Sequence, residues 1–379
     1  MKGPGSKVRH VALFHPCLIH GGIPRVFADL ARGFLQAGLA VDIVQATRES
    51  DFIGQLPSAA RVIDLNARRA LTSFVPLVRY LRQERPDVLI SGAVQTNVVA
   101  AWARRAANVE TRLVLTEHSM LSAVIESAAR LSTSVRTRIS PFFIRRFYPW
   151  ADALVAVSQG AAEDLAAVTG IPLAKIHVIH NPVVSPELFM QAAEPLEHPW
   201  FGDGDPPVVL AVGRLDYFKD YPTLLRAFAK LRETTTARLL ILGEGDQRGL
   251  LESMIRELNV EADVALPGNV ANPLPFMKRA AVFALSSSTE SFGNVLVEAL
   301  AAGAAIVATD CRFGPREILA AGAYGTLVPV GDHDALARAI NNALSEPHCV
   351  PPAEALTRFS REASVKAYLR LICQLSSND

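Results

Sequence analysis

Short apolar runs alternate with amphipathic stretches along most of this 379-residue chain. Apolar runs of about four to eight residues between turn residues are typical of buried strands, and helical spacing of apolar positions between them predicts helices. Strands are predicted over residues 8–15, 40–45, 61–65, 87–91, 112–116, 153–157 and 175–179, then over 208–212, 239–242, 264–266, 282–285, 306–309 and 326–328. Ser158 is a predicted helix N-cap, and Gly170 ends the same helix. The alternation indicates the α/β class, with parallel sheets and right-handed crossovers.

A proline-rich segment separates the two series of elements. Residues 182–207 carry many prolines and little periodicity, which is typical of a linker. We therefore predict two doubly wound, Rossmann-like domains facing each other across a cleft, over residues 1–181 and 182–361. Ligands of such folds bind outside the carboxyl ends of the parallel strands. The loops at those ends are therefore expected to carry the chemistry.

The composition indicates a globular protein of two cores. Half of the residues are apolar, 20% are charged, and the mean hydropathy is +0.22. No stretch reaches the roughly 18 uncharged apolar residues that a membrane span requires. The first residues are typical of an opening strand rather than a signal peptide. The four cysteines have no metal-ligand spacing, which favours reduced thiols and a cytoplasmic location.

Positive charge is concentrated in the first part of the chain. Residues 1–150 contain 20 Lys and Arg against 10 Asp and Glu, although the net charge of the whole chain is only +1. A basic half suggests an anionic partner such as a phospholipid surface or a diphosphate-linked acceptor. No nucleic-acid partner is expected, because no zinc module and no aromatic-and-basic binding motif is present.

Two glutamates with seven residues between them, Glu290 and Glu298, stand at the start of an apolar helix. Glu290 lies in the loop after the strand 282–285, and Glu298 lies roughly 5 Å further along the helix axis. The free N–H groups at a helix N-terminus attract anions, and carboxylates accept hydrogen bonds from hydroxyls. A sugar nucleotide, which carries hydroxyls and phosphates, suits this arrangement. Taken alone, the glutamates also fit a solvated helix face or, for Glu290, a helix cap.

Gly213, Arg214 and Lys219 follow the first strand of the second series, in the loop GRLDYFKD. Arginine supplies a planar fork of donors and lysine a point charge, which together suit a diphosphate. The pair would stabilise the charge that builds up on a leaving nucleotide diphosphate. The alternative is two ordinary solvated loop charges.

These motifs together resemble the E-x7-E signature and its surroundings in retaining glycosyltransferases of the two-Rossmann-domain (GT-B) type, in particular glycosyltransferase family 4. The resemblance covers nearly the whole chain and is most specific over residues 207–329, where VVLAVGRLDYFKD, the E-x7-E segment and DCRFGPREIL stand in the family's order. It implies that Glu290 contacts hydroxyls of the donor sugar and that Glu298 contacts the ribose. It also implies that the terminal helix, within residues 362–379, crosses back onto the first domain.

Further donor contacts follow from the same resemblance. They are expected from Gly22, Gly213, Val270, Ser291, Phe292, Gly293, Asn294, Val295 and Leu296, the last six through the turn and helix start after Glu290. His118, at the end of the strand RLVLTEH, matches a family histidine that reaches the donor sugar, and Glu117 beside it weakly favours an N-acetylhexosamine. A packed or surface histidine is the alternative for His118, and a tight turn is the alternative for the glycine pair at 21–22.

Residues 127–151 interleave arginines with bulky apolar residues and contain no acid. Arg136, Arg138, Arg145 and Arg146 form a candidate membrane and acceptor patch, because such a segment can lie at an anionic bilayer interface. The alternative is a solvated helix whose apolar side packs on the core.

The resemblance implies a metal-independent, retaining hexosyltransferase. It also implies that the first domain binds the acceptor and the second binds the nucleotide-sugar donor. No P-loop, Asp-x-Asp or G-x-G-x-x-G motif is found where it would be needed, so no metal and no cofactor is expected. We expect a UDP-sugar donor and a lipid-diphosphate-linked acceptor at the cytoplasmic face of the membrane. Two alternatives are a same-scaffold enzyme with a soluble acceptor, such as a sugar-nucleotide epimerase or a sucrose/trehalose-type synthase, and a non-catalytic nucleotide-sugar-binding subunit.

Overall fold

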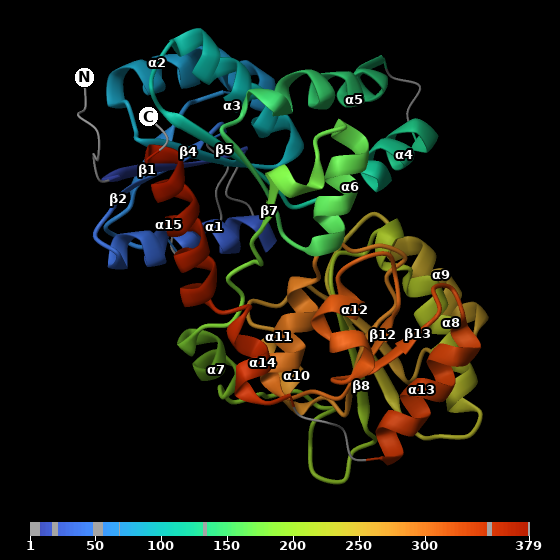
Figure 1. The fold of residues 1–379 in the computed structure, drawn as a ribbon. Helices are drawn as coiled ribbons and strands as arrows, with labels where there is room; N and C mark the ends of the chain where they lie inside the picture. Colours follow the sequence, from blue (N-terminus) through green and yellow to red (C-terminus); the bar gives the residue numbers. More distant parts are fainter. Residues whose placement is uncertain are drawn as a thin grey trace. The chain divides into compact units, whose positions relative to one another are not determined.

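A computed structural model describes residues 8–16, 22–47, 56–67, 69–131, 135–346 and 351–377, and the side chains of these ranges outside 127–140. The chain forms two compact units (Figure 1). Unit 1 comprises Met1–Pro182 together with Phe359–Asp379, and unit 2 comprises Val183–Arg358. The change from unit 1 to unit 2 thus falls at the start of the proline-rich segment.

Unit 1 contains a seven-stranded parallel sheet in the order β3-β2-β1-β4-β5-β6-β7. Its strands are β1 His10–His15, β2 Ala40–Gln45, β3 Arg61–Asp64, β4 Val88–Gly92, β5 Arg112–Glu117, β6 Ala153–Ala156 and β7 Ile176–Val178. Its helices are α1 Gly22–Gln36, η2 Ala70–Ser73, α2 Phe74–Glu84, α3 Val94–Ala107, α4 Leu121–Leu131, α5 Val135–Phe147, η3 Tyr148–Trp150, α6 Gln159–Thr169, η4 Leu173–Lys175 and α15 Arg361–Ser377. The strand order reverses direction between β1 and β4.

Unit 2 contains a six-stranded parallel sheet in the order β10-β9-β8-β11-β12-β13. Its strands are β8 Val208–Val212, β9 Arg238–Leu242, β10 Val264–Gly268, β11 Val282–Leu285, β12 Ile306–Thr309 and β13 Thr326–Val328. Its helices are α7 Pro186–Ala192, η5 Tyr217–Lys219, α8 Tyr221–Arg232, α9 Arg248–Glu257, α10 Leu274–Arg279, α11 Asn294–Ala302, α12 Pro315–Ile318, η6 Ala320–Gly322, α13 His333–Ser345 and α14 Ala353–Thr357. Here the order reverses between β8 and β11, which is where doubly wound sheets bind ligands.

Each sheet is buried on both faces, as the continuous apolar runs require. In unit 2, alternate strand residues such as Val209 and Ile241 pack with α8, α9 and α13 in one core cluster. The intervening residues, such as Leu210 and Phe283, are fully buried as well. The predicted α/β class and parallel sheets are therefore confirmed.

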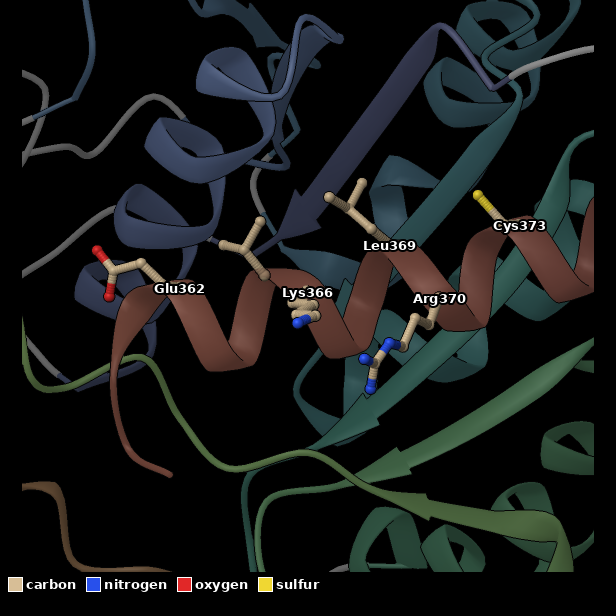
Figure 2. Close-up of a pocket in the computed structure, with 6 residues that line it drawn as sticks. Glu362, Lys366, Leu369, Arg370 and Cys373 are labelled. Atoms are coloured by element: carbon tan, nitrogen blue, oxygen red, sulfur yellow. The ribbon is translucent and has the colours of Figure 1, made fainter. Parts of the chain in front are cut away.

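The C-terminal helix α15 belongs to unit 1, as the family resemblance implies, and packs on α1. A buried ion pair joins the two helices, with Arg361 Nη2 2.9 Å from Asp29 Oδ1. A Cβ added to Gly33 would lie 2.2 Å from Cγ2 of Val365, so the close approach of the helices requires glycine there. Figure 2 shows α15 with a hollow along it, lined by Glu362, Lys366 and Cys373 among others. None of the helices in the described ranges has the length and hydropathy of a membrane span.

Candidate functional site

Asp216 organises the loop between β8 and α8. Its Oδ1 accepts hydrogen bonds from the backbone N–H groups of Phe218 at 3.0 Å and Lys219 at 3.2 Å, and its Oδ2 accepts one from Arg214 Nε at 2.8 Å. Asp216 is thus the cap of the short helix η5, a role that suits its acceptor oxygens. The Arg214 side chain remains 73% exposed. The loop therefore presents Arg214 to solvent and fixes the backbone of Lys219.

The neighbouring loop after β9 packs directly on this one. Leu215 N–H donates to Glu244 O at 2.9 Å, and a Cβ added to Gly243 would lie 2.0 Å from the carbonyl oxygen of Gly213. Only a residue without a side chain allows this approach of two backbones. This contact fixes the backbone of Gly213 and Arg214.

Lys219 and Glu290 form an ion pair between the loops that follow β8 and β11. Lys219 Nζ lies 2.5 Å from Glu290 Oε1, and Ser287 Oγ donates to the same carboxylate oxygen at 2.8 Å. The side chains of Lys219 and Glu290 are 19% and 11% exposed. The pair is therefore accessible from solvent and stands at the reversal point of the sheet.

Ser286 and Ser288 connect the same two loops. Ser286 Oγ donates to Lys219 O at 2.7 Å, and Ser288 N–H donates to Phe218 O at 2.8 Å.

Burial, followed by the nearby Glu290 charge, raises the pKa of the Cys311 thiol to about 12. The same two causes in the same order raise the pKa of the Tyr221 phenol. Both groups are neutral beside the ion pair at pH 7.

Glycines at two positions allow the close backbone approach in and around the turn between Glu290 and α11. Gly293 is the N-cap of α11 at a φ of 101°, which favours glycine. Gly314 has a φ of 82°, and a Cβ there would lie 2.3 Å from Phe292 O and 3.3 Å from Glu290 Cβ. Gly314 thus supports the backbone that carries Glu290. Glu298, on α11, is buried rather than on a solvated helix face.

The structure gathers some predicted donor residues and separates others. The carboxyl ends of the adjacent strands β8 and β11 carry these residues, in the loops and in the first helical residues that follow: Gly213, Arg214, Lys219, Glu290, Ser291, Gly293 and Asn294. The side chains of Phe292 and Leu296 are fully buried, and the Leu296 N–H donates to Gly293 O at 2.9 Å. Val295 is partly buried on α11. Val270 follows β10, which β9 separates from β8.

The carboxyl edge of the unit 1 sheet carries buried polar groups. His118 follows β5 and its ring centroid lies 6.2 Å from that of Phe27. Burial, and then the charge of His15, lowers the pKa of His118 to about 3, against the hydrogen bond of Asn181, so the imidazole is neutral near pH 7. Glu117 accepts from Tyr148 Oη at 2.9 Å and from Ser119 N–H at 3.0 Å. Burial raises the pKa of the Glu117 carboxyl to about 7.

The remaining predicted residues of unit 1 lie on helices. Gly22 is the exposed first residue of α1, and Gly21 lies outside the described residues. Arg145 and Arg146 are exposed on α5, where Arg145 Nε donates to Val168 O at 2.7 Å. The side chains of Arg136 and Arg138 lie outside the described part.

Sequence reasoning missed Asp216, Ser287 and the support from Gly243 and Gly314. An acid two residues after Arg214 and just ahead of a short helix is a capping signal that was available. The serine run 286–288 is separated from Glu290 by Thr289 alone, and Ser287 bonds Glu290 only three positions on. The bonds of Ser286 and Ser288 join residues about 70 positions apart and have no local pattern.

Two family models together match most of the chain. "Glycosyltransferase Family 4" matches residues 20–185, and "Glycosyl transferases group 1" matches residues 197–364. The two matches fall on unit 1 and unit 2 in turn, and the sheet orders agree with a two-Rossmann fold. The chain belongs to family 4 of the retaining glycosyltransferases and has the GT-B fold.

Individual relatives agree with this assignment. The chain is 32% identical over 250 residues to an N-acetylgalactosamine-N,N'-diacetylbacillosaminyl-diphospho-undecaprenol 4-alpha-N-acetylgalactosaminyltransferase of Campylobacter jejuni, a match that covers 66% of this chain and 65% of that protein. It is 29% identical to the lipopolysaccharide core biosynthesis glycosyltransferase LpsE of Rhizobium meliloti, covering 93% of this chain and 96% of that protein. Its fold is similar to a sucrose-phosphate synthase of Thermosynechococcus elongatus, with a TM-score of 0.78, 21% identity, and coverage of 98% and 100%.

Proposed function

We propose that this protein transfers a hexose or an N-acetylhexosamine from a nucleotide-diphosphate sugar, with UDP as the default nucleotide, to a lipid-diphosphate-linked sugar. The reaction retains the anomeric configuration, uses no metal ion, and serves surface polysaccharide or glycan assembly. The observation that carries the proposal is the Lys219–Glu290 pair at the reversal point of the unit 2 sheet. It combines a cation for a diphosphate with an acceptor for sugar hydroxyls beside a helix N-terminus.

In this proposal unit 2 is the donor-binding domain. Lys219 and Arg214 bind the diphosphate and stabilise the charge that develops on it as the glycosidic bond breaks. The exposed Arg214 can exchange its bond with Asp216 for a phosphate oxygen at little cost, because exposed ion pairs contribute little. Glu290 accepts from hydroxyls of the sugar and Glu298 from those of the ribose, while backbone N–H groups at the start of α11 face the phosphates.

Unit 1 is the proposed acceptor domain. A neutral His118 is suited to a hydrogen bond with a sugar hydroxyl rather than to charge compensation. The acceptor proton leaves toward a phosphate oxygen of the departing nucleotide during attack on the front face. The Campylobacter relative is named for a diphospho-undecaprenol acceptor and LpsE for lipopolysaccharide core synthesis, which supports a lipid-linked acceptor here. A peripheral position on the cytoplasmic face of the membrane follows from that acceptor.

A panel of nucleotide sugars tests the donor part of the proposal. Each is added to the protein and the melting temperature is measured, because a ligand that binds the native form raises it. The donor with the largest shift is then supplied with a polyprenyl-diphosphate sugar in one assay and with soluble sugars or sugar phosphates in another, both in EDTA. Transfer to the lipid-linked acceptor alone supports the proposal. Transfer only to soluble acceptors favours a synthase, and donor binding without transfer or hydrolysis favours a non-catalytic subunit.

A further inference from the structure

Unit 1 carries exposed apolar side chains on three helical segments, η2–α2, α3 and α5, of which α3 contacts the other two (Figure 1). We call this set the aromatic face and define it as Leu71, Val75, Trp102, Phe142 and Phe143. Phe142 is 63% exposed, Trp102 is 47% exposed, and the others range between 37% and 51%. Exposed apolar groups that gather in this way mark a surface for a partner rather than ordinary scatter.

Ring contacts connect members of the aromatic face on α3 and α5 through the buried Phe147, and connect α3 to α2 through the partly buried Phe74. Trp102 lies 5.1 Å from Phe74 and 5.8 Å from Phe147, measured between ring centroids. Phe147 in turn stacks on Phe143 at 5.7 Å with an interplanar angle of 12°. Segments about 30 to 70 residues apart in the sequence therefore contribute to one surface.

The aromatic face is exposed although other side chains of the same helices are buried. On α5, Ile144 and Phe147 are buried between the exposed Phe142, Phe143 and Arg146. On η2–α2, Leu71 and Val75 lie four residues apart and hence on one side of the helical segment, while Leu77 and Leu81 fill the core. The core therefore does not account for the exposed residues.

Arginines lie next to the aromatic face, over Trp150, whose ring centroid is 4.7 Å from that of Phe147. The guanidinium of Arg105 lies 4.9 Å above the ring of Trp150, and that of Arg146 lies 4.8 Å from the same ring. No acid occurs between residues 127 and 151. Tryptophan and arginine side chains together suit the boundary between anionic headgroups and acyl chains, since each has an apolar body and a polar end.

We propose that the aromatic face docks unit 1 on an anionic phospholipid bilayer, with the rings at the level of the headgroups and Arg105 and Arg146 against phosphates. The biological purpose of this contact rests on the proposed function, because a lipid-linked acceptor is presented at a membrane. The physical contact is independent of it. Positive charge on the whole first part of the chain supports attraction to an anionic surface.

Vesicle co-sedimentation tests the docking. The full-length protein is mixed with vesicles of phosphatidylglycerol and phosphatidylcholine, or of phosphatidylcholine alone, at low and high salt. Wild type is expected to bind the anionic vesicles at least tenfold better than the neutral ones, and to bind less at high salt. The variant Leu71→Ser/Val75→Ser/Phe142→Ser is expected to lose at least tenfold in vesicle affinity at an unchanged melting temperature.

A matched control makes the same kind of substitution, exposed apolar to serine, on unit 2. Met190 and Leu250 are 72% and 51% exposed, so Met190→Ser/Leu250→Ser removes comparable apolar groups without touching the aromatic face. This variant is expected to bind vesicles as wild type does. The docking proposal is overturned if wild type fails to bind anionic vesicles at low salt, or if the two variants bind equally. It is also overturned if wild type forms oligomers without lipid that the triple variant abolishes, which would identify a protein partner.

Transfer to a short-chain, water-soluble acceptor separates this inference from the proposed function. The triple variant is expected to keep wild-type turnover with that acceptor and to lose it with the acceptor embedded in vesicles. Absence of transfer by every protein, wild type included, would reject the proposed function and leave the sedimentation result to decide the docking.

Discussion

Lys219 and Glu290 are partly open to solvent at the carboxyl edge of the six-stranded sheet, whereas Glu117 and His118 are buried at the corresponding edge of the seven-stranded sheet. In unit 2 the opposite charges neutralise each other, and the proposed function has them exchanged for those of a ligand. In unit 1 burial drives the pKa of His118 down to about 3, so the imidazole is neutral near pH 7, and raises the pKa of Glu117 to about 7, so this carboxyl is protonated far more readily than an ordinary glutamate. One edge is thus suited to a charged diphosphate and the other to uncharged hydroxyls.

Removing the cation should have the largest effect on the unit 2 edge. Lys219→Ala is expected to lower kcat by about 10²–10³-fold, the effect of losing one donor to a developing anion. Lys230→Ala is the matched control, because Lys230 forms an exposed ion pair with Asp334 elsewhere on unit 2. Steady-state transfer kinetics measure both variants. Equal rates for wild type and Lys219→Ala would reject the role of Lys219 in charge stabilisation.

The buried carboxyl of Glu117 should make the stability of the protein depend on pH. The ordinary pKa of 4.5 is raised to about 7 in the folded state, so the folded protein binds the proton more strongly. The free energy of unfolding therefore falls as the pH rises from about 4.5 to 7, by on the order of 3 kcal/mol from this group. Glu117→Gln should remove that fall.

His118 acts in the opposite direction, because its lowered pKa makes stability fall as the pH drops below about 6.5. The difference between the unfolding free energies of wild type and Glu117→Gln, measured in urea across pH 4.5–8, cancels this contribution. A difference that stays constant with pH would show that Glu117 does not titrate in that range. The contrast between the two edges would then be lost.

Gly314 tests whether the backbone under Glu290 is as tightly fitted as its geometry indicates. Gly314 and Gly331 both have a positive φ, but only Gly314 has another atom within 3 Å of an added Cβ. Gly331→Ala should cost about 1–2 kcal/mol of stability from the backbone alone. Gly314→Ala should cost about 1–3 kcal/mol more through overpacking, and should weaken donor binding. Equal unfolding free energies for the two variants would contradict this reading.

Two substitutions of Asp216 separate its capping from its ion pair. Asp216→Ala removes the acceptor for the Phe218 and Lys219 N–H groups and should weaken nucleotide-diphosphate affinity by about 1 kcal/mol. Asp216→Asn keeps an acceptor oxygen and loses only the pair with exposed Arg214, so its affinity should stay close to wild type. Calorimetric titration with the nucleotide diphosphate measures both, and identical affinities would remove Asp216 from the site.

The strands were predictable because parallel strands are continuous apolar runs between turn residues. The strands at 40–45, 208–212, 282–285, 306–309 and 326–328 match the structure to the residue. Local caps were predictable too, and Ser158 Oγ accepts from Ala161 N–H as expected while Gly170 ends α6 in the left-handed region. β10 was predicted too short, since it continues through Pro267 to Gly268 rather than ending at 266. An edge strand tolerates a proline that cannot donate.

The site itself was predictable as residue types but not as contacts. The E-x7-E spacing and the Gly-Arg-Lys loop have local patterns, so they identified the segments. The bond between Lys219 and Glu290 joins residues 71 positions apart and depends on the adjacency of β8 and β11. The aromatic face likewise depends on packing of α3 against α2 and α5, so the segment 127–151 revealed only part of it.

Donor affinity in two variants tests the central claim most directly. Calorimetric titration of the best nucleotide-diphosphate sugar into wild type, Lys219→Ala and Glu298→Gln measures the contributions of the diphosphate and ribose contacts separately, with the nucleoside monophosphate as a second ligand. The account predicts that Lys219→Ala lowers the affinity for the nucleotide-diphosphate sugar far more than the affinity for the nucleoside monophosphate. It also predicts that Glu298→Gln lowers the affinities for both ligands about equally. Unchanged affinities for both ligands in both variants would contradict a donor site at the carboxyl edge of the unit 2 sheet.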